Sequence, residues 1–213
     1  QYHGANRLGA NSLLSCIYSG LVTGVEIPRY IEELTTSYRD VSSEVYEKAM
    51  KKEEDFKTDL MSRSGNENVH KLHDELSDIM VKDVTVKRNN KDLAKALEGI
   101  KDLRERYKDI TLGDHSRFAN QTYIFANQFY YMLELALVIT KGALLRNEFR
   151  GSHYKPEFPE RNDEEWLKTT IAEFDEKNGE PKISYDEVDK RHLKPILRDY
   201  TQAKKVKPKL DNI

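Results

Sequence analysis

The residues best suited to chemistry lie near the start of the chain, in a glycine-rich segment built around Arg7. Glycines let a backbone turn sharply and let a ligand approach closely. An arginine guanidinium is a rigid, permanently charged fork that matches a carboxylate. Asn11 and Ser12 can cap a helix directly afterwards, and the first N–H groups of that helix favour negative charge. The segment therefore indicates either an anion-binding loop or, as is commoner for short glycine patterns, a plain turn with a surface arginine.

A pair of histidines is a weaker candidate site. His70 and His73 lie three residues apart near Glu67 and Asp74, so they could form a metal-binding face of a helix. Zinc sites need three or four protein ligands, and no third ligand is anchored elsewhere in the sequence. A solvated helix face is the better interpretation, and we expect no metal.

Two further features have structural explanations. Cys16 is the single cysteine, which excludes an internal disulfide and fits a reducing compartment. Its place in the first expected helix favours a buried small apolar residue over a reactive thiol. An aromatic cluster could stack against a ring, but its helical spacing favours a core or interdomain surface. The cluster consists of Tyr123, Phe125, Phe129, Tyr130 and Tyr131.

Composition and charge argue against several classes of protein. Charged residues make up 34% of the chain and hydrophobic residues 38%, and the mean hydropathy is −0.78. The net charge is −2 with lysine and arginine scattered, which argues against a nucleic-acid partner. No apolar stretch approaches the roughly 20 residues of a membrane helix, and no signal peptide is recognisable. Because residue 1 is glutamine, we expect the chain to begin inside a longer protein.

The elements that must position these residues are mostly helices. The first is expected to start at Asn11 or Ser12 and to stop at Gly24 and Pro28, with a short helical segment over 29–35.

Apolar residues spaced by three and four predict the helices that follow. Three of them are expected to start at Ser42 or Ser43, at Asn66, and at Asn89 or Asn90. The fourth and longest is expected over 116–147. A short extended piece over 84–86 is expected between the second and third. Helices of this kind with short connections form antiparallel bundles.

Glycine and proline after residue 150 argue against a further helix. Strands are expected over 166–174 and 183–188, on either side of the turn signal Asn178-Gly179. The expected fold is therefore mainly α, an antiparallel helical bundle with a small C-terminal β-hairpin, preceded by a loop and helix.

Two stretches carry the most specific sequence signal. Residues 3–14 read His-Gly-Ala-Asn-Arg-Leu-Gly-Ala-Asn-Ser-Leu-Leu, and residues 146–153 read Arg-Asn-Glu-Phe-Arg-Gly-Ser-His. The first resembles the substrate and flavin segment of the succinate dehydrogenase and fumarate reductase flavoprotein family. The second, continued by 154–156 and 163–168, resembles the family segment that leads into its terminal hairpin.

This resemblance implies three regions. Residues 1–40 would be the end of an FAD-binding domain, including its substrate and flavin loop and its last helix. Residues 41–149 would be the family's helical domain. Residues 150–213 would be an irregular segment, the hairpin and a charged tail.

The resemblance also implies the site residues. Arg7 corresponds to the family arginine that binds a carboxylate of succinate or fumarate, and the backbone of Ser12 and Leu13 to the positions that meet the flavin. His3 and Asn11 would position these residues without touching the ligands themselves. For His3, fixing the loop by hydrogen bonds is an equally good role.

The implied activity is that of a larger subunit. The parent would oxidise succinate to fumarate, transferring a hydride to FAD, and would pass electrons to quinone through an iron–sulfur subunit and a membrane-anchor cytochrome b subunit. Fumarate reduction is the alternative direction, and Gly9-Ala10 argues against an aspartate oxidase. The family's FAD-binding motifs precede these segments, so we expect the chain alone to lack FAD and activity and to serve as a non-catalytic helical docking domain.

The expected location is cytoplasmic, peripheral on the inner face of a bacterial cell membrane, without direct insertion. The second matching stretch departs from the family pattern at Phe149, where serine is usual, and at Ser152, where alanine is usual. Glu148 and Arg150 are therefore interpreted structurally, as an ion-paired junction that packs the helical domain on the FAD domain.

Overall fold

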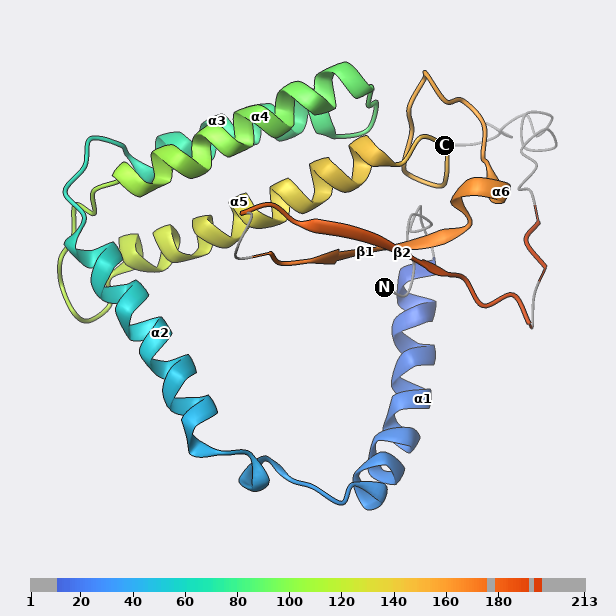
Figure 1. The fold of residues 1–213 in the computed structure, drawn as a ribbon, viewed down its shortest axis with the longest axis horizontal. Coiled ribbons are helices and arrows are strands. Elements are labelled where there is room, and N and C mark those ends of the chain that lie inside the picture. Colours follow the sequence, from blue (N-terminus) through green and yellow to red (C-terminus); the bar gives the residue numbers. More distant parts are fainter. Residues whose placement is uncertain (1–10, 176–178, 192–193, 197–213) are drawn as a thin grey trace, which may run out of the picture.

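The computed structural model describes residues 11–175, 179–191 and 194–196. These residues form a mainly helical fold with one antiparallel hairpin (Figure 1). The α-helices are α1 (Asn11–Glu33), α2 (Ser43–Ser62), α3 (Val69–Ile79), α4 (Asn90–Arg106), α5 (Gln121–Leu145) and α6 (Asp163–Trp166). Short turns of other helix types are η2 (Tyr38–Asp40), η3 (Met80–Val84) and η4 (Tyr107–Asp109), and the strands are β1 (Lys168–Glu173) and β2 (Lys182–Glu187). The predicted fold class is confirmed, whereas the domain boundaries at 40 and 149 stay predictions.

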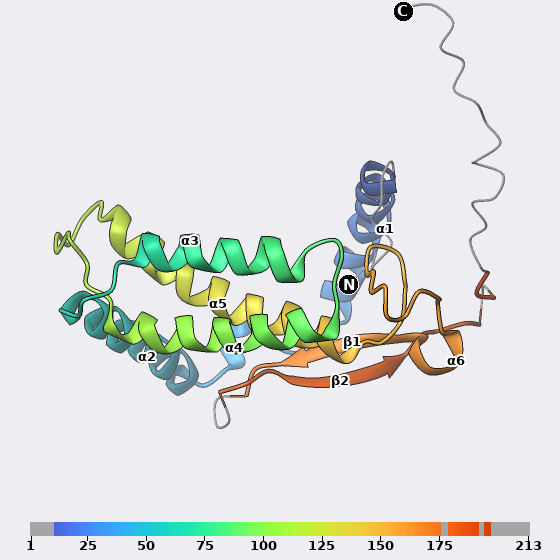
Figure 2. The ribbon, with the colours of Figure 1, turned by 90° about the horizontal axis from the view of Figure 1, so that it is seen from above.

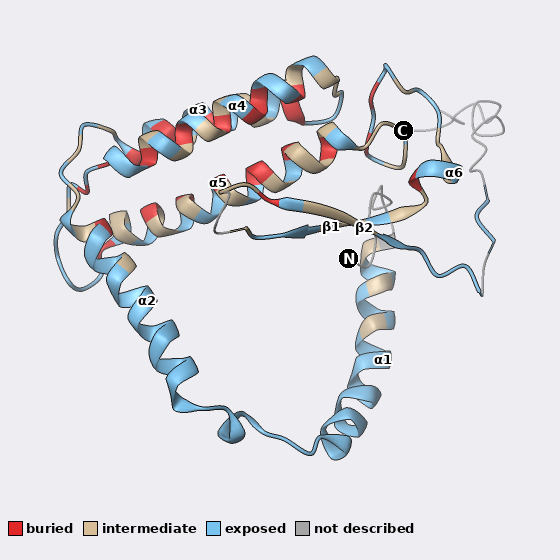
Figure 3. Cartoon of the chain, in the orientation of Figure 1, coloured by how far each residue is buried: buried red, intermediate tan, exposed pale blue. Residues whose placement is uncertain are grey.

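Helices α3, α4 and α5 run side by side and form the body of the molecule (Figure 2). Their facing stripes meet in one core, because apolar residues three and four apart lie on one face of a helix. Phe129 and Leu133 of α5 and Ile100 of α4 are fully buried there. The hairpin lies along α5, with Thr170 of β1 opposite Tyr185 of β2. Burial is concentrated in this body, and most of α1 and α2 is exposed (Figure 3).

Asparagine and serine caps set the helix starts, and some differ from the predicted ones. Ser42 and Asn89 cap α2 and α4 as predicted. The cap of α3 is Asn68 rather than Asn66, and its side chain accepts hydrogen bonds from two backbone N–H groups. The longest helix starts at Gln121 rather than at 116, because Asn120 caps it by accepting from the N–H of Tyr123 at 2.8 Å.

Two predictions of extended backbone were wrong. Residue 84 belongs to η3, which continues α3 as a wider turn, and the chain only bends at 85 and 86. Trp166, predicted to start a strand, is instead the last residue of α6, because Asn162 accepts a hydrogen bond from the N–H of Glu165 at 3.0 Å and starts a helical turn. The hairpin itself is confirmed, and Gly179 in its connection has a φ of +63°. Asn178 lies outside the described residues.

Helix α1 departs most from its prediction. It continues through Gly24 and Pro28 to Glu33, so the expected stop and the separate segment over 29–35 were wrong. Pro28 removes one N–H from the hydrogen-bond ladder and crowds the carbonyl four residues before it, yet the helix continues to Glu33. Cys16 is exposed rather than buried, because no described element covers this part of α1.

Candidate functional site

The first turn of α1 carries the predicted cofactor contacts. The described part of α1 starts at Asn11, and Ser12 and Leu13 follow directly. The first N–H groups of a helix have no intrahelical acceptor, so the backbone of this turn favours a negatively charged ligand. Arg7 and His3 lie outside the described residues. The roles of these five residues toward substrate and flavin therefore stay predictions.

Beyond that turn, α1 exposes apolar side chains around most of its circumference (Figure 3). They include Leu14, Ile17, Leu21, Val25 and Ile31, each between 53% and 70% exposed. A helix that is apolar on most sides is normally buried in its native setting. The surface of α1 therefore fits a helix that packs inside a larger domain. Among the described residues, no helix is long and apolar enough to cross a bilayer.

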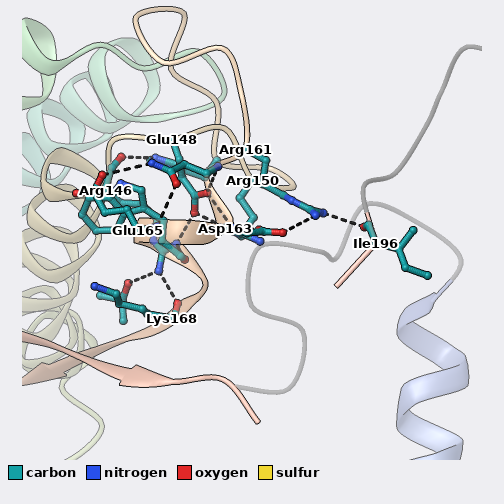
Figure 4. Close-up of polar contacts among 12 residues, drawn as sticks. Arg146, Glu148, Arg150, Arg161, Asp163, Glu165, Lys168 and Ile196 are labelled. Atoms are coloured by element: carbon teal, nitrogen blue, oxygen red, sulfur yellow. Dashed lines mark hydrogen bonds and ion pairs between the residues drawn. The ribbon is translucent and has the colours of Figure 1, made fainter. Parts of the chain in front are cut away.

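Glu148 lies at the centre of the second matching stretch and is fully buried (Figure 4). Arg150 donates to both of its oxygens, from Nε to Oε1 at 2.8 Å and from Nη2 to Oε2 at 2.9 Å. Arg146 donates to Oε1 from the other side, and the backbone N–H of Asn162 donates to Oε2 at 3.2 Å. Arg150 also binds Asp163 at 2.7 Å. The buried carboxylate thus has the partners that its desolvation requires.

This cluster joins the end of α5 to α6 and the start of β1. Arg146 donates to the backbone carbonyls of Trp166 at 2.8 Å and of Lys168 at 2.6 Å, and its guanidinium lies 5.4 Å from the centre of the Trp166 ring. The interpretation of Glu148 and Arg150 as an ion-paired junction agrees with this geometry, and the surfaces that they join are the bundle and the hairpin. Packing against an FAD domain stays a prediction. Arg146 opens the second matching stretch, but its contacts with α6 and β1 were not predicted.

His153 is buried beside this cluster, and its two neighbours define its tautomer. Its Nε2 lies 2.8 Å from the carbonyl oxygen of Arg146, which can only accept, so Nε2 carries the hydrogen. Its Nδ1 lies 2.8 Å from the guanidinium of Arg88, which can only donate, so Nδ1 is unprotonated. Burial lowers the pKa of His153 to about 4, and the nearby positive charge of Arg88 contributes.

Lys155 is fully buried and binds neutral oxygens. Its Nζ donates to the carbonyl of Leu144 at 2.9 Å and to Oδ1 of Asn147 at 3.1 Å, at the C-terminal end of α5. Carbonyls at a helix C-terminus favour a cation. Burial nevertheless lowers the pKa of Lys155 to about 8.

Chemically, this cluster holds structure together. Its donors and acceptors are occupied by one another, which leaves Glu148 and His153 without a position from which to reach a substrate. The two histidines considered as metal ligands pack on aromatic rings instead. The His70 ring stacks on Phe125 with centroids 4.5 Å apart, and the His73 ring meets the edge of Phe125 at 5.4 Å. In the described part of the chain, no three histidine, cysteine, aspartate or glutamate residues are grouped as a metal site.

A comparison with protein families identifies the fold and these segments. The family profile described as the C-terminal part of the fumarate reductase flavoprotein matches residues 73–200, which include most of the bundle core, the Glu148 cluster and the hairpin. The chain belongs to the succinate dehydrogenase and fumarate reductase flavoprotein family. The Glu148 cluster is therefore part of the C-terminal region of that family.

Individual relatives agree with this assignment. The chain is 47% identical over 205 residues to the succinate dehydrogenase flavoprotein subunit of Bacillus subtilis, covering 96% of this chain and 35% of that protein. It is 32% identical over 201 residues to the fumarate reductase flavoprotein subunit of Helicobacter pylori, covering 93% and 28%. The fold matches a variant of quinol fumarate reductase FrdA from E. coli with a TM-score of 0.71 and 26% identity, over 74% of this chain and 27% of that one. The chain thus spans about a third of the length of these relatives.

The functional features that sequence reasoning missed are all buried contacts. Arg88 is far from His153 in the sequence, so their contact could not be predicted from spacing. Lys155 reaches the end of α5 only across a turn, and no pattern of neighbouring residues marks a lysine as buried. Gly151 was the available signal, because its φ of +58° marks the tight turn that brings His153 back to the end of α5.

Proposed function

We propose that this chain is the C-terminal part of the flavoprotein subunit of a succinate dehydrogenase. The observation that carries the proposal is the 47% identity with a succinate dehydrogenase flavoprotein subunit, compared with 32% for the fumarate reductase relative. The parent subunit would oxidise succinate to fumarate. The family resemblance around residues 3–14 favours this over an aspartate oxidase.

Arg7 would hold one carboxylate of the dicarboxylate substrate. Its two parallel donors fix the orientation of the carboxylate as well as its position, so the reacting C–H bond is aligned, and alignment lowers the activation barrier. His3 and Asn11 would hold the loop in the conformation that presents Arg7. The chain thereby contributes binding and orientation.

The start of α1 fits the FAD that the family implies. Reduced flavin carries negative charge on its pyrimidine side, and the backbone N–H groups at Ser12 and Leu13 lie in the first turn of a 23-residue helix, where they favour such charge. FAD, when bound, supplies the acceptor for the substrate hydride. Residues that precede this chain would provide the rest of its site, so the isolated 213 residues would not retain it.

The parent would pass electrons to quinone through an iron–sulfur subunit and a membrane-anchor cytochrome b subunit. It would then sit at the cytoplasmic, inner face of a bacterial membrane. The names of the relatives support assembly with other subunits, because they are flavoprotein subunits of succinate dehydrogenase or fumarate reductase. Fumarate reduction is the second candidate direction, because relatives of both names match.

The experiment that tests the site is Arg7→Lys in the full-length subunit. Lysine keeps the charge but loses the bidentate fork, so we expect bound FAD at the wild-type ratio and a loss of most succinate-dependent dye reduction. Arg29→Lys is the matched control, because Arg29 is an exposed arginine of α1 that pairs with Glu26, and it should retain full turnover. Near-normal turnover of Arg7→Lys would refute the assignment.

Two further measurements complete the test. Rates of succinate oxidation and fumarate reduction with matched dyes give the preferred direction of the parent. An absorbance spectrum of the isolated chain tests the docking-domain interpretation, for which we expect helical circular dichroism without flavin bands. Stoichiometric FAD with succinate-dependent dye reduction in the isolated chain would contradict it.

A further inference from the structure

A groove of about 800 Å³ lies where α2 meets the start of α5. One wall is formed by the last turns of α2, including Lys57 and Met61, and the other by Tyr123 and the segment over 115–120. The junction of α2 and α5 that forms it lies at one end of the long axis of the molecule, and α1 lies well away from it, toward the side of α6 (Figures 1 and 2). The start of α1, which carries the proposed flavin contacts, is therefore remote from it.

Phe118 stands at the edge of this groove and is 88% exposed, the most exposed of the large hydrophobic side chains. Its exposure is imposed by a well-bonded loop. The buried side chain of Asn120 donates to the carbonyls of Asp114 at 2.7 Å and Ser116 at 3.1 Å. The hydroxyl of Ser116 in turn donates to the carbonyl of Phe118 at 3.2 Å. The loop thus holds an aromatic ring in water.

The next residue, Ala119, has a φ of +53°, in the left-handed region that disfavours any residue with a Cβ. Such conformations persist only where surrounding contacts impose them, and they are concentrated at binding sites. Here the imposing contacts are those of Asn120. A strained residue beside an exposed aromatic ring points to a surface that is shaped to bind.

The charged side chains that line the groove are Lys57 and Arg117, and His115 lies between them in the lining. Lys57 lies above the Tyr123 ring, with its Nζ 5.5 Å from the ring centre. Nδ1 of His115 lies 3.3 Å from the carbonyl of Met61. The groove therefore combines apolar walls with two cationic side chains, Lys57 and Arg117, which complement a segment that carries an apolar and an acidic side chain.

We propose that this groove docks a segment of a separate polypeptide, with an apolar side chain against Phe118 and a carboxylate against Arg117 and Lys57. The charge of these two cationic side chains selects an acidic partner. A separate polypeptide is favoured over the preceding part of the same protein, because α1, the first described element, lies far from the groove in both views. Arg117 selects the partner by charge, and Phe118 provides the apolar anchor.

The experiment places the photo-crosslinking amino acid p-benzoylphenylalanine at position 118 of the full-length flavoprotein, in cells that assemble its complex. After irradiation, mass spectrometry identifies the attached peptide. We expect one peptide from a separate polypeptide, with an aspartate or glutamate within a few residues of the crosslink. The matched control carries the same amino acid at Phe174, which is 63% exposed at the end of β1, and should not give that peptide.

Charge variants then test the recognition. We expect Arg117→Glu to reduce the crosslink yield about tenfold, and an acid-to-lysine change in the identified peptide to restore it when the two are combined. FAD content and dye-linked turnover of Arg117→Glu should equal those of the wild type, so failure here is distinguishable from failure of the proposed function. The proposal is overturned by a crosslink to the preceding part of the same chain or to a second copy. It is equally overturned by a peptide without an acidic residue, by yield that is unchanged in Arg117→Glu, or by no crosslink above the control.

Discussion

Arg150 binds both oxygens of the fully buried Glu148, at 2.8 and 2.9 Å, and so fixes the turn that follows α5. Arg146 shares the same carboxylate and connects it to the backbone of α6 and β1. One side chain thereby sets how the hairpin lies on the bundle. Removing its charge leaves two guanidinium groups close together without their common partner.

We expect Glu148→Gln to lower the free energy of unfolding by about 3–5 kcal/mol, because breaking a buried ion pair leaves an uncompensated charge. Urea unfolding followed by circular dichroism measures this loss. Glu164→Gln is the matched control, since Glu164 is exposed in α6, and it should change stability by less than about 0.5 kcal/mol. Equal stability of the two variants would show that the cluster contributes nothing.

The buried imidazole of His153 should make stability depend on pH. Its pKa falls from an ordinary 6.5 to about 4 through burial next to Arg88, with further positive charge from Lys155 and Arg146. Between these values the unfolded chain binds a proton that the folded chain does not. The contribution of His153 to the free energy of unfolding is therefore fully present above pH 6.5, and up to about 3 kcal/mol of it is lost as the pH drops to 4.

Urea unfolding at pH 7 and pH 5 measures this slope. His153→Gln keeps one donor and one acceptor without a titrating group, so the difference between the two pH values should shrink. His115→Gln, at an exposed histidine, should leave it unchanged. A slope that is the same in His153→Gln as in the wild type would contradict the burial argument.

Glu180 anchors the far end of the hairpin to the bundle. Lys101 and Lys141 lie 2.7 and 2.9 Å from its two oxygens, and hydrogen bonds from these lysines lower its pKa from an ordinary 4.5 to about 2. Its contribution is present above pH 4.5 and is lost as the pH falls toward 2. Because the carboxylate is 37% exposed, we expect only about 0.5–1 kcal/mol.

In a thermal melt at pH 7, Glu180→Gln should lower Tm by about 1–4 °C. The difference should diminish in 1 M salt, which screens exposed charges. Glu187→Gln, at an exposed position of β2, should leave Tm unchanged. A Tm loss that persists in full at 1 M salt would indicate packing rather than charge.

Gly65 ends the turn after α2 with no room for a side chain. A Cβ there would lie 1.8 Å from the backbone oxygen of Asp109, and backbone cannot rotate away as a side chain can. We expect Gly65→Ala to cost about 3 kcal/mol, measured by urea unfolding. Gly113→Ala, where a Cβ meets nothing within 4 Å, is the control and should be neutral or slightly stabilising. Unchanged stability of Gly65→Ala would mean that this turn can move freely.

Local sequence signals predicted much of the bundle. Ser42 and Asn89 were identifiable as caps because their side chains compete for the free N–H groups of a helix start. The start of α5 was misplaced because Phe118 continues the apolar spacing of the helix. The contacts of Asn120 with the preceding loop decide the boundary instead. Those contacts depend on a left-handed backbone turn at Ala119, and an alanine in the sequence does not predict such a turn.

Long-range effects explain the other errors. Cys16 was expected to be buried because the apolar sequence around it is typical of a covered helix, and the sequence does not say which polypeptide segment provides the cover. Lys155 and His153 were missed because their burial depends on the turn at Gly151, which folds them against the end of α5. Glu148 was recognised as ion-paired only through the family resemblance.

The apolar circumference of α1 has a consequence for the chain in solution. Contacts between such helices on different molecules form at a rate that grows with the square of concentration. We expect the isolated chain to elute from a sizing column as a monomer when dilute and to form heavier species as the load increases. The mean hydropathy of the chain is that of a well-solvated protein, but the exposed apolar helix α1 would then limit its solubility.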